Sequence, residues 1–384
     1  MRRKMASTIR GLRPLVVLCS LAYLLVNPGC SKDETPTNPQ PGSLQEEIDQ
    51  IASEYVRVGA VFGIIDRQHN KLFFSYGTKA TSSAEPPDAN TVFEIGSITK
   101  TFTCILMADM FLKGSLSDDT VGHYLPADKV SMPSREGVQI RFFHLATHSS
   151  GIPRRPQEAN YPYPPGYQPS DPYAVYTTEH VYDCLTNYCQ LEFTPGTYWL
   201  YSNMGMGLAG HVVGLVDGTS YEQVLTREIF DVLAMGNSSL FLTDQQRSNL
   251  AVGHNSTLTM VPNWTAQDIF QGAGFIKSSA NDMLKYMEAN LGLVQSPLKP
   301  AMDLSHQPQF HQGSLGEMGL GWFIQELDDG QVVTYHGGGT GGYDSYLGFN
   351  KAASTGSVLL FNSKVNESVY VIGERVLKAV GKHP

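Results

Sequence analysis

Residues 91–102 read Thr91-Val-Phe-Glu-Ile-Gly-Ser-Ile-Thr-Lys-Thr-Phe102 and carry the most informative pattern in this sequence. The spacing of the apolar residues that follow, up to Gly114, predicts a buried amphipathic helix that begins close to Ser97. Residues three apart lie on one face of a helix, so Lys100 is expected to point at the Ser97 hydroxyl. A serine hydroxyl is a weak nucleophile without a base. Burial or a nearby positive field would lower the pKa of the Lys100 amine enough for it to serve as that base.

An isolated Ser-x-x-Lys has a simpler explanation, in which the serine is only the N-cap of the helix. The same spacing occurs a second time, at Ser296-Pro-Leu-Lys299, where Pro300 follows and no long apolar helix does. We assign no catalytic role to that second copy. Support for the first copy has to come from elsewhere in the chain.

A second motif, Tyr201-Ser-Asn203, places a phenol and an amide on one short segment. It follows a Pro-Gly turn at 195–196 and leads into residues 204–214, whose many small residues predict a helix that packs closely in a core. This is the one Tyr-x-Asn in a chain with 19 tyrosines. A loop with a buried aromatic residue is the alternative explanation.

A third motif begins at His336, where the apolar run from Val332 meets a series of glycines that ends before Tyr343. This pattern predicts a strand whose backbone another group approaches closely. A structural histidine and a phosphate-binding loop are the alternatives. No helical pattern follows directly and no Lys-Ser/Thr closes the run, which argues against a P-loop.

With these three motifs in this order, the chain resembles the serine β-lactamase and penicillin-binding-protein superfamily. The pattern Ser-x-x-Lys, Tyr-x-Asn and Lys- or His-x-Gly is typical of its class C β-lactamase and D-alanyl-D-alanine carboxypeptidase branch, and is related to the class A pattern. Further segments look like family segments, and they lie at 91–102, 116–126, 144–153 and 272–282. The resemblance covers roughly residues 45–383.

The resemblance implies a mixed α/β (α+β) fold, in which an antiparallel sheet flanked by helices lies beside a mainly helical subdomain, with the site between them. The sequence pattern agrees with this β-lactamase/transpeptidase-like fold. It predicts a hairpin at each end of the chain and mostly helix and long loops between them; the elements expected are hairpins at 58–76 and 346–362, a middle region at 97–325 and a last helix at 369–380. The Pro- and Tyr-rich segment 153–172 is expected to be a loop over the cleft, with an inert surface loop as the alternative.

By the same resemblance, Ser97 forms an acyl-enzyme with the substrate carbonyl, while Lys100 and Tyr201 share the proton transfer. The sequence leaves open which of the two is the base. Asn203 would orient the substrate amide and help to hold Lys100. The N–H groups of Ser97 and Gly339 would bind the oxyanion. The substrate-binding residues expected are Asn203, His336, Gly338 and Gly339. No metal and no cofactor is expected.

The third motif also bears on the substrate. His336 stands where a lysine is more familiar and could relay protons or carry a part-time positive charge. Gly337 and Gly339 stand where hydroxyl side chains are common, and Thr340 offers a hydroxyl one residue further on. We therefore expect weak turnover of penicillins and of peptides that end in free D-Ala, and better turnover of esters or amides without that carboxylate. A cation from elsewhere, such as Lys277, is the alternative.

The N-terminus has the pattern of an export signal, with basic residues before the apolar run 15–26 and Asn27-Pro-Gly-Cys30 after it. We expect a signal peptide at 1–29, a lipidated Cys30 at the start of a flexible tether over 30–43, and a hydrolase domain over 44–384. The protein would be anchored to a membrane by lipid, in the bacterial periplasm or at the cell surface. Ordinary secretion is the alternative, because Asn27 is not the usual aliphatic residue.

The net charge and the cysteine content bear on the kind of partner and on the presence of disulfides. Residues 1–29 hold five of the 27 Lys and Arg and none of the 36 acidic residues, so their removal would lower the net charge from −9 to about −14. This charge argues against a nucleic-acid partner. The partner that the resemblance implies is a small-molecule or peptide substrate. Cys104 is expected in the core, and Cys184 and Cys189 are either a disulfide or two thiols.

An α/β-hydrolase esterase and a binding or sensor protein are the two alternatives to hydrolysis by this site. The chain has no Gly-x-Ser-x-Gly, which argues against an α/β-hydrolase esterase. The remaining alternative is a lipid-anchored binding or sensor protein that keeps the fold and has little turnover.

Overall fold

The computed structural model of the protein describes residues 42–117, 120–313 and 316–383, which belong to one compact unit that begins at Gly42. The signal peptide, Cys30 and the tether up to residue 41 lie outside the described residues. Within the ranges described, no helix combines the length and the apolar character that a membrane span needs.

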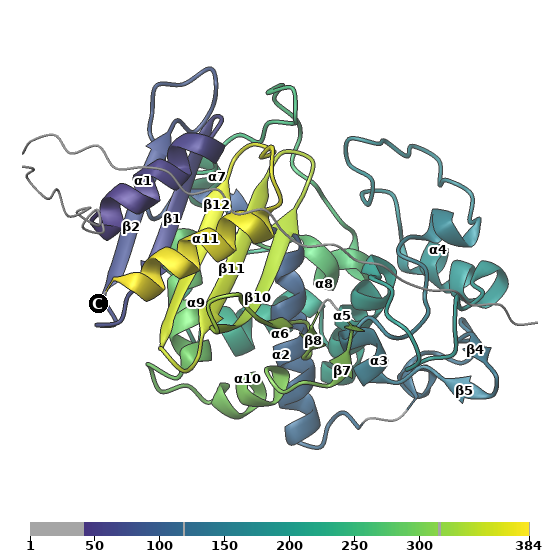
Figure 1. Ribbon diagram of the computed structural model, residues 1–384. Helices are drawn as coiled ribbons and strands as arrows, with labels where there is room; N and C mark the ends of the chain where they lie inside the picture. The colour runs from purple at the N-terminus through teal and green to yellow at the C-terminus, as the bar shows by residue number, and fades with distance from the viewer. Residues whose placement is uncertain (1–41, 118–119, 314–315, 384) are drawn as a thin grey trace, which may run out of the picture. The chain divides into compact units, whose positions relative to one another are not determined.

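An eight-stranded antiparallel sheet has the strand order β2-β1-β12-β11-β10-β9-β8-β7 (Figure 1). Its strands are β1 (Gly59–Ile65), β2 (Lys71–Gly77), β7 (Phe310–His311), β8 (Glu317–Met318), β9 (Phe323–Glu326), β10 (Val332–Gly339), β11 (Asp344–Asn350) and β12 (Thr355–Phe361). β1 pairs with β12, with Ala60 opposite Phe361. The sheet is therefore built from both ends of the chain, and both predicted hairpins are confirmed.

The first hairpin turns where the sequence predicted it. His69 has a left-handed backbone with φ of 64°, and the Asp66 carboxylate accepts hydrogen bonds from the backbone N–H groups of Gln68 and Asn70 at 2.9 and 2.8 Å. A short acidic side chain that satisfies the turn backbone in this way stabilises the reversal of the chain.

Helices α1 (Leu44–Tyr55) and α11 (Val369–Lys382) cover one face of the sheet (Figure 1). The last helix is thus confirmed. A capping box between Ser43 and Glu46 starts α1. The apolar core on this face, here called the outer core, consists mainly of Ile48, Ile51, Phe62, Ile64, Leu359, Phe361, Ile372, Val376, Leu377 and Val380.

The other face of the sheet carries the helical region, where α9 (Ala280–Leu291) packs on β1 and β12. Its core, here called the inner core, is the larger of the two. The other helices of this region are α2 (Thr99–Leu112), α3 (Phe142–Ala146), α4 (Thr178–Asp183), α5 (Asn203–Asp217), α6 (Tyr221–Leu225), α7 (Asp244–Ser248), α8 (Gln271–Gly274) and α10 (Lys299–Ser305).

Short elements complete the fold. Two small antiparallel pairs join β3 (Val92–Glu94) to β6 (Lys277–Ser279) and β4 (Ser134–Arg135) to β5 (Val138–Gln139). The single-turn 3₁₀ and π segments are η1 (Gly96–Ile98), η2 (Val121–Tyr124), η3 (Pro156–Ala159), η4 (Cys184–Tyr188), η5 (Thr226–Phe230) and η6 (Asp268–Phe270).

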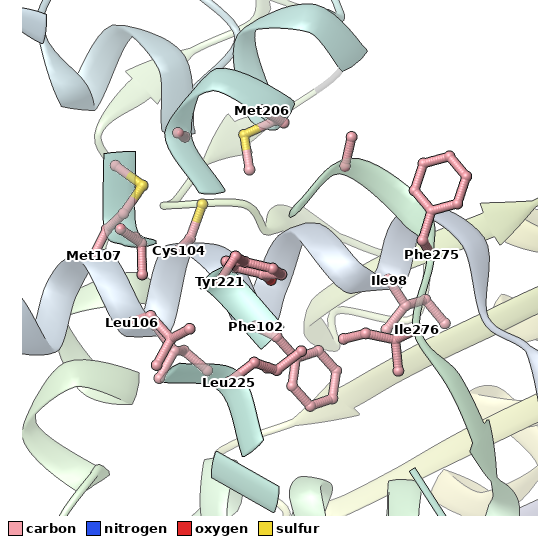
Figure 2. Close-up of a cluster of buried hydrophobic side chains, with 14 of the residues drawn as sticks. Ile98, Phe102, Cys104, Leu106, Met107, Met206, Tyr221, Leu225, Phe275 and Ile276 are labelled. Atoms are coloured by element: carbon pink, nitrogen blue, oxygen red, sulfur yellow. The ribbon is translucent and has the colours of Figure 1, made fainter. Parts of the chain in front are cut away.

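Helix α2 lies in the middle of the inner core, surrounded by side chains of other elements (Figure 2). The predicted buried helix is confirmed, but its amphipathic character is not: every residue from Thr99 to Met110 is buried, so the helix has no solvent face along that length. Its threonines are satisfied inside the core. Thr101 donates to the carbonyl of Ile98 at 2.8 Å, and Thr103 donates to the carbonyl of Gly272 at 2.8 Å.

Helix α5 packs closely through its small residues, as its sequence predicted. A Cβ atom on Gly210 would lie 2.8 Å from the Cα of Gly272 in α8, and one on Gly207 would lie 2.5 Å from the carbonyl oxygen of Ile269. Only glycine permits this approach. The contact brings α8 next to α2 and α5, which matters for the site below.

The cysteines in the described part of the chain are free thiols. Cys104 is in the inner core, as expected, and Cys184 and Cys189 are both buried. Of the two alternatives for Cys184 and Cys189, the structure therefore shows two thiols and not a disulfide.

Candidate active site

Ser97 lies in the turn η1, between strand β3 and helix α2. Gly96 before it has φ of 49°, and a Cβ atom there would lie 2.6 Å from the backbone nitrogen of Gly339. This glycine lets the turn rest directly on the end of β10. The helix α2 has no side-chain N-cap bond, so the N-cap alternative for Ser97 is wrong.

Lys100 is completely buried and its amine faces three oxygen atoms. Nζ lies 3.0 Å from Ser97 Oγ, 2.9 Å from Asn203 Oδ1 and 2.5 Å from the carbonyl oxygen of Ala273 in α8. Burial, and then the positive charge of Arg154, lower the pKa of the Lys100 amine well below its usual value. Both effects favour the neutral amine.

A neutral amine fits this set of partners. It has two hydrogens and one lone pair. The oxygens of Asn203 and Ala273 can only accept, so they take the two hydrogens. The lone pair is then left for the Ser97 hydroxyl, which is both a donor and an acceptor. The geometry can therefore remove a proton from Ser97.

Tyr201 comes from the segment before α5, and its ring contacts the Lys100 amine and the Arg154 guanidinium. The Lys100 Nζ is 4.7 Å and the Arg154 guanidinium carbon 4.9 Å from the ring centroid. Burial raises the pKa of the phenol, while a hydrogen bond with Ser97 and the charge of Arg154 act in the opposite direction. Because burial is the largest of these effects, the phenol stays protonated.

His148 holds this motif in place. Its ring centroid is 4.3 Å from that of Tyr201, and its Nδ1 accepts the backbone N–H of Ser202 at 3.2 Å. The residue is completely buried, and its backbone is left-handed, with φ of 57°. The sequence placed it in a family-like segment without giving it a role.

Asn203, the first residue of α5, has both ends of its amide engaged. Oδ1 accepts from Lys100, and Nδ2 donates to the hydroxyl of Tyr173 at 2.7 Å. Tyr173 was not singled out by sequence.

The imidazole of His336 is completely buried, with ring centroids 5.2 Å from Phe323 and 6.3 Å from Tyr201. Nδ1 lies 2.6 Å from the carbonyl oxygen of Gly337, which can only accept, so Nδ1 carries the hydrogen. Burial and then the charge of Lys100 lower the pKa of His336 to about 3. The expectation of a part-time positive charge was therefore wrong, because the residue is buried and neutral.

Two hollows meet at Ser97. One, of about 600 Å³, is lined by Ser97, Arg154, Trp199, Tyr201, Phe323, Gln325, Tyr335, Gly337, Gly338, Gly339, Val369 and Tyr370. The other, of about 350 Å³, is lined by Ser97, Arg154, Arg155, Tyr167, Pro169, Pro172, Tyr173, Asn203, Trp264, Ala273, Gly274, Phe275 and Gly339. The first is here called the aromatic hollow and the second the loop hollow.

The structure thus brings most of the predicted site residues together. Ser97, Tyr201, Gly338 and Gly339 line the aromatic hollow, Asn203 lines the loop hollow, and Lys100 lies beneath Ser97. His336 is close by but lines neither hollow, and neither does the hydroxyl of Thr340, which is buried. The loop 153–172 borders the site, as expected.

Lys277 is not the cation of the site, so the alternative that named it was wrong. Its amine donates to the carbonyl oxygens of Leu240 and Trp264, and it lines neither hollow. Arg154 lines both hollows, and in the described part of the chain its guanidinium forms no ion pair. Sequence analysis missed it; its position directly after the family-like segment 144–153 was the available signal.

The second Ser-x-x-Lys has only structural contacts. Lys299 pairs with the Asp303 carboxylate one turn further along α10, and Ser296 accepts the backbone N–H of Leu298 at 3.2 Å. This agrees with giving that copy no catalytic role.

A serine, a buried amine with a lowered pKa and a phenol beside a strand edge define an acyl-transfer enzyme of the serine hydrolase class. The family model described as Beta-lactamase matches residues 44–381, so the chain belongs to the β-lactamase family. It is a serine hydrolase of the β-lactamase type.

Known relatives agree with this family. The chain is 26% identical over 363 residues to a β-lactamase of Psychrobacter immobilis, covering 83% of each chain, and 23% identical over 378 residues to a β-lactamase of Escherichia coli K12, covering 89% of this chain and 94% of the relative.

Solved structures share the fold. A β-lactamase/D-alanine carboxypeptidase from Pseudomonas syringae matches with a TM-score of 0.74 at 24% identity, over 87% of this chain and 97% of that one. One from Yersinia pestis matches with a TM-score of 0.75 at 21% identity, over 88% and 98%. The predicted fold class is confirmed.

Proposed function

We propose that Ser97 attacks the carbonyl carbon of an ester or amide and carries the acyl group until water releases it. The observation that carries this proposal is the buried Lys100 amine, 3.0 Å from Ser97 Oγ, whose two other neighbours are both acceptors. These partners leave the lone pair of the neutral amine to Ser97 and make Lys100 the base for acylation.

In the first step the Oγ–C bond forms while the hydroxyl proton moves to Lys100 Nζ. The backbone N–H groups of Ser97 and Gly339 stabilise the oxyanion. The bond from carbon to the leaving atom then breaks. The protonated Tyr201 phenol donates its proton to the leaving atom and regains one from the Lys100 ammonium. In the second step the oxygen of water bonds to the acyl carbon, while its proton passes through Tyr201 to Lys100. The Oγ–C bond then breaks, Lys100 returns a proton to Ser97 Oγ, and the acid product leaves.

The substrate in this proposal is an ester or amide without a free carboxylate next to the scissile bond. Two features support it: the neutral state of His336, and the absence of a hydroxyl on Gly337 and Gly339. Charge-assisted hydrogen bonds are about twice as strong as neutral ones, and β10 offers a carboxylate none from its side chains. Penicillins and peptides that end in free D-Ala are therefore weak substrates.

The test of the nucleophile is a serine-directed label. Fluorophosphonate, followed by intact mass and peptide mapping, should modify Ser97 alone and leave Ser97→Ala unmodified. Lys100→Ala and Tyr201→Phe should each lower the acylation rate by about 10²-fold or more, the scale of general acid–base catalysis. Label on another serine, or near-normal single-turnover rates in both variants, would contradict the assignment.

The substrate class is tested by a peptide pair that differs only in a free or an amidated C-terminus. A preference of about tenfold or more for the free acid, which is about 1.4 kcal/mol, would overturn it and point to Arg154 as the residue that binds the carboxylate. A burst of acylation without sustained hydrolysis would instead support the sensor alternative.

We further propose that the protein is exported and is anchored by lipid on Cys30, in the periplasm or at the cell surface. The support is in the sequence: the basic N-terminus, the apolar run 15–26 and the polar tether. Metabolic labelling with a fatty-acid analogue should mark the wild type and not Cys30→Ser. A mature N-terminus elsewhere, without lipid, would contradict it.

A further inference from the structure

The aromatic hollow has an almost continuous wall of rings. Trp199, Phe323 and Tyr335 are half-buried, and Tyr370 is 39% exposed. Ring centroids are 5.6 Å apart for Tyr370 and Tyr335, 5.5 Å for Tyr335 and Phe323, 6.3 Å for Phe323 and Trp199, and 6.2 Å for Trp199 and Tyr201. The rings thus form a chain of contacts that leads from helix α11 to Tyr201, which itself contacts Lys100.

Tyr370 reaches this wall because β10 has a glycine beneath it. A Cβ atom on Gly337 would lie 2.7 Å from Tyr370 Cε1 and 3.0 Å from Val369 Cγ2. The start of α11 is held by Ser368, whose hydroxyl accepts the backbone N–H of Tyr370 at 3.3 Å. Gly337 therefore has two effects: it offers no hydroxyl to a substrate carboxylate, and it leaves room for the Tyr370 ring.

The two hollows differ in which part of the site they adjoin. Tyr201 lines the aromatic hollow and not the loop hollow, whereas Asn203 lines only the loop hollow. In the function proposed above, Tyr201 gives a proton to the leaving atom. The leaving group must then lie on the Tyr201 side, which is the aromatic hollow.

We propose that the aromatic hollow binds the leaving group of the substrate, that this group is an aryl or arylalkyl alcohol or amine, and that Tyr370 sets the preference for it. The inference rests on the proposed function. Planar aromatic groups gain from edge-to-face and offset contacts with rings at these separations, beyond the gain from burial alone. Part of the Tyr370 ring is open to solvent and is available for such a contact.

The test compares the benzyl and 2-methoxyethyl esters of butyric acid. The two leaving alcohols are close in acidity and the acyl group is the same, so a difference in kcat/KM reports binding of the leaving group. The wild type should prefer the benzyl ester by about tenfold. Tyr370→Ala should remove most of this preference, and Tyr370→Phe, which keeps the ring, should retain it.

Val371→Ala is the matched control, because Val371 is the next residue of α11, is exposed and lines neither hollow. It should keep the wild-type preference. If Tyr370→Ala does not fold, as judged by circular dichroism, Tyr370→Leu replaces it, since leucine keeps apolar bulk without a ring.

Failure of this inference can be told apart from failure of the proposed function. If Ser97-dependent hydrolysis occurs but the two esters react equally, or if Tyr370→Ala and Tyr370→Leu both keep the preference, only the assignment of the aromatic hollow is overturned. If neither ester acylates Ser97 and the fluorophosphonate label is also absent, the proposed function fails and the inference fails with it.

Discussion

Arg154 acts on several groups of the site at once, although it bonds to none of them. Its guanidinium lies over the Tyr201 ring. Its charge lowers the pKa of Lys100, second only to burial, and adds a smaller effect to the lowering of the His148 pKa by burial, Lys100 and His336. Its backbone is fixed to the residue that follows the second motif, since the N–H of Met204 donates to its carbonyl at 3.1 Å. The charge is therefore held at a set place above the proton-transfer residues.

We predict that Arg154→Gln moves the acid limb of the kcat/KM profile to higher pH. Only the neutral Lys100 amine can take the Ser97 proton, so activity rises as pH passes the Lys100 pKa in the free enzyme. Removal of a nearby positive charge raises that pKa, and a higher pH is then needed to form the neutral amine. The measurement is kcat/KM against pH with an uncharged ester.

Arg155→Gln is the matched control for this prediction. The Arg155 guanidinium pairs with Glu158 at 3.1 Å, and its charge is not among the causes of the Lys100 shift. Its acid limb should coincide with that of the wild type. An unchanged limb in Arg154→Gln, or an equal shift in both variants, would contradict the electrostatic role.

Sequence could predict the Ser97–Lys100 pair because their contact is local. Residues three apart meet wherever a helix forms, whatever surrounds it. Arg154 and His148 could not be given roles, because their positions depend on long-range contacts with residues 201–204. The charge of His336 was predicted wrongly for a related reason. Burial keeps this imidazole neutral, and the spacing of residues in a strand does not tell how deeply one side chain is buried.

At the scale of elements, α2 shows how a polar pattern can mislead. Thr99, Thr101 and Thr103 place three polar side chains in the first turns of a helix that was predicted to be amphipathic. In the fold, a threonine hydroxyl can bond to a backbone carbonyl, and Thr101 and Thr103 do so. These residues are therefore as buried as the apolar ones, and the helix is covered on all sides. Hydrophobic periodicity predicted where in the sequence the helix lies. Which neighbours cover the helix depends on the fold of the whole chain.

We predict that Gly210→Ala destabilises the protein by about 1–3 kcal/mol, the range for overpacked cores. The added Cβ would lie 2.8 Å from the Cα of Gly272, a backbone atom that can move only with α8. Ala273 in α8 accepts a hydrogen bond from Lys100, so kcat/KM should fall as well. Urea denaturation and ester hydrolysis measure the two effects.

Gly236→Ala is the control, because a Cβ atom at Gly236 meets no atom within 4 Å and its backbone is not left-handed. It should change stability by about 0.5 kcal/mol or less. Equal losses in the two variants would show that close packing of α5 on α8 is not what requires glycine at position 210.

At the scale of the whole molecule, the sheet separates two cores. Alternate residues of β1 point to opposite faces, with Val61 and Ile65 in the inner core and Phe62 and Ile64 in the outer core. The site lies on the inner side, yet α11 of the outer face supplies Tyr370 to it. Since β1 comes from the start of the described chain and β12 from its end, neither core can form without both ends of the chain.

We predict that both cores unfold as one unit, and Leu377→Ala tests this. Leu377 is buried in the outer core, and its truncation should cost about 2–5 kcal/mol. The three tryptophans, Trp199, Trp264 and Trp322, all lie outside the outer core, at the aromatic hollow or in and against the inner core. Tryptophan fluorescence therefore reports on the side of the sheet that the substitution does not touch.

In urea, the fluorescence midpoint should fall together with the midpoint from circular dichroism, because strands shared by both cores couple them. Val371→Ala, exposed on the same helix, should leave both midpoints in place. A fluorescence midpoint that stays at the wild-type value while the dichroism midpoint falls would mean that the outer face unfolds on its own, and that Tyr370 could leave the aromatic hollow without loss of the catalytic core.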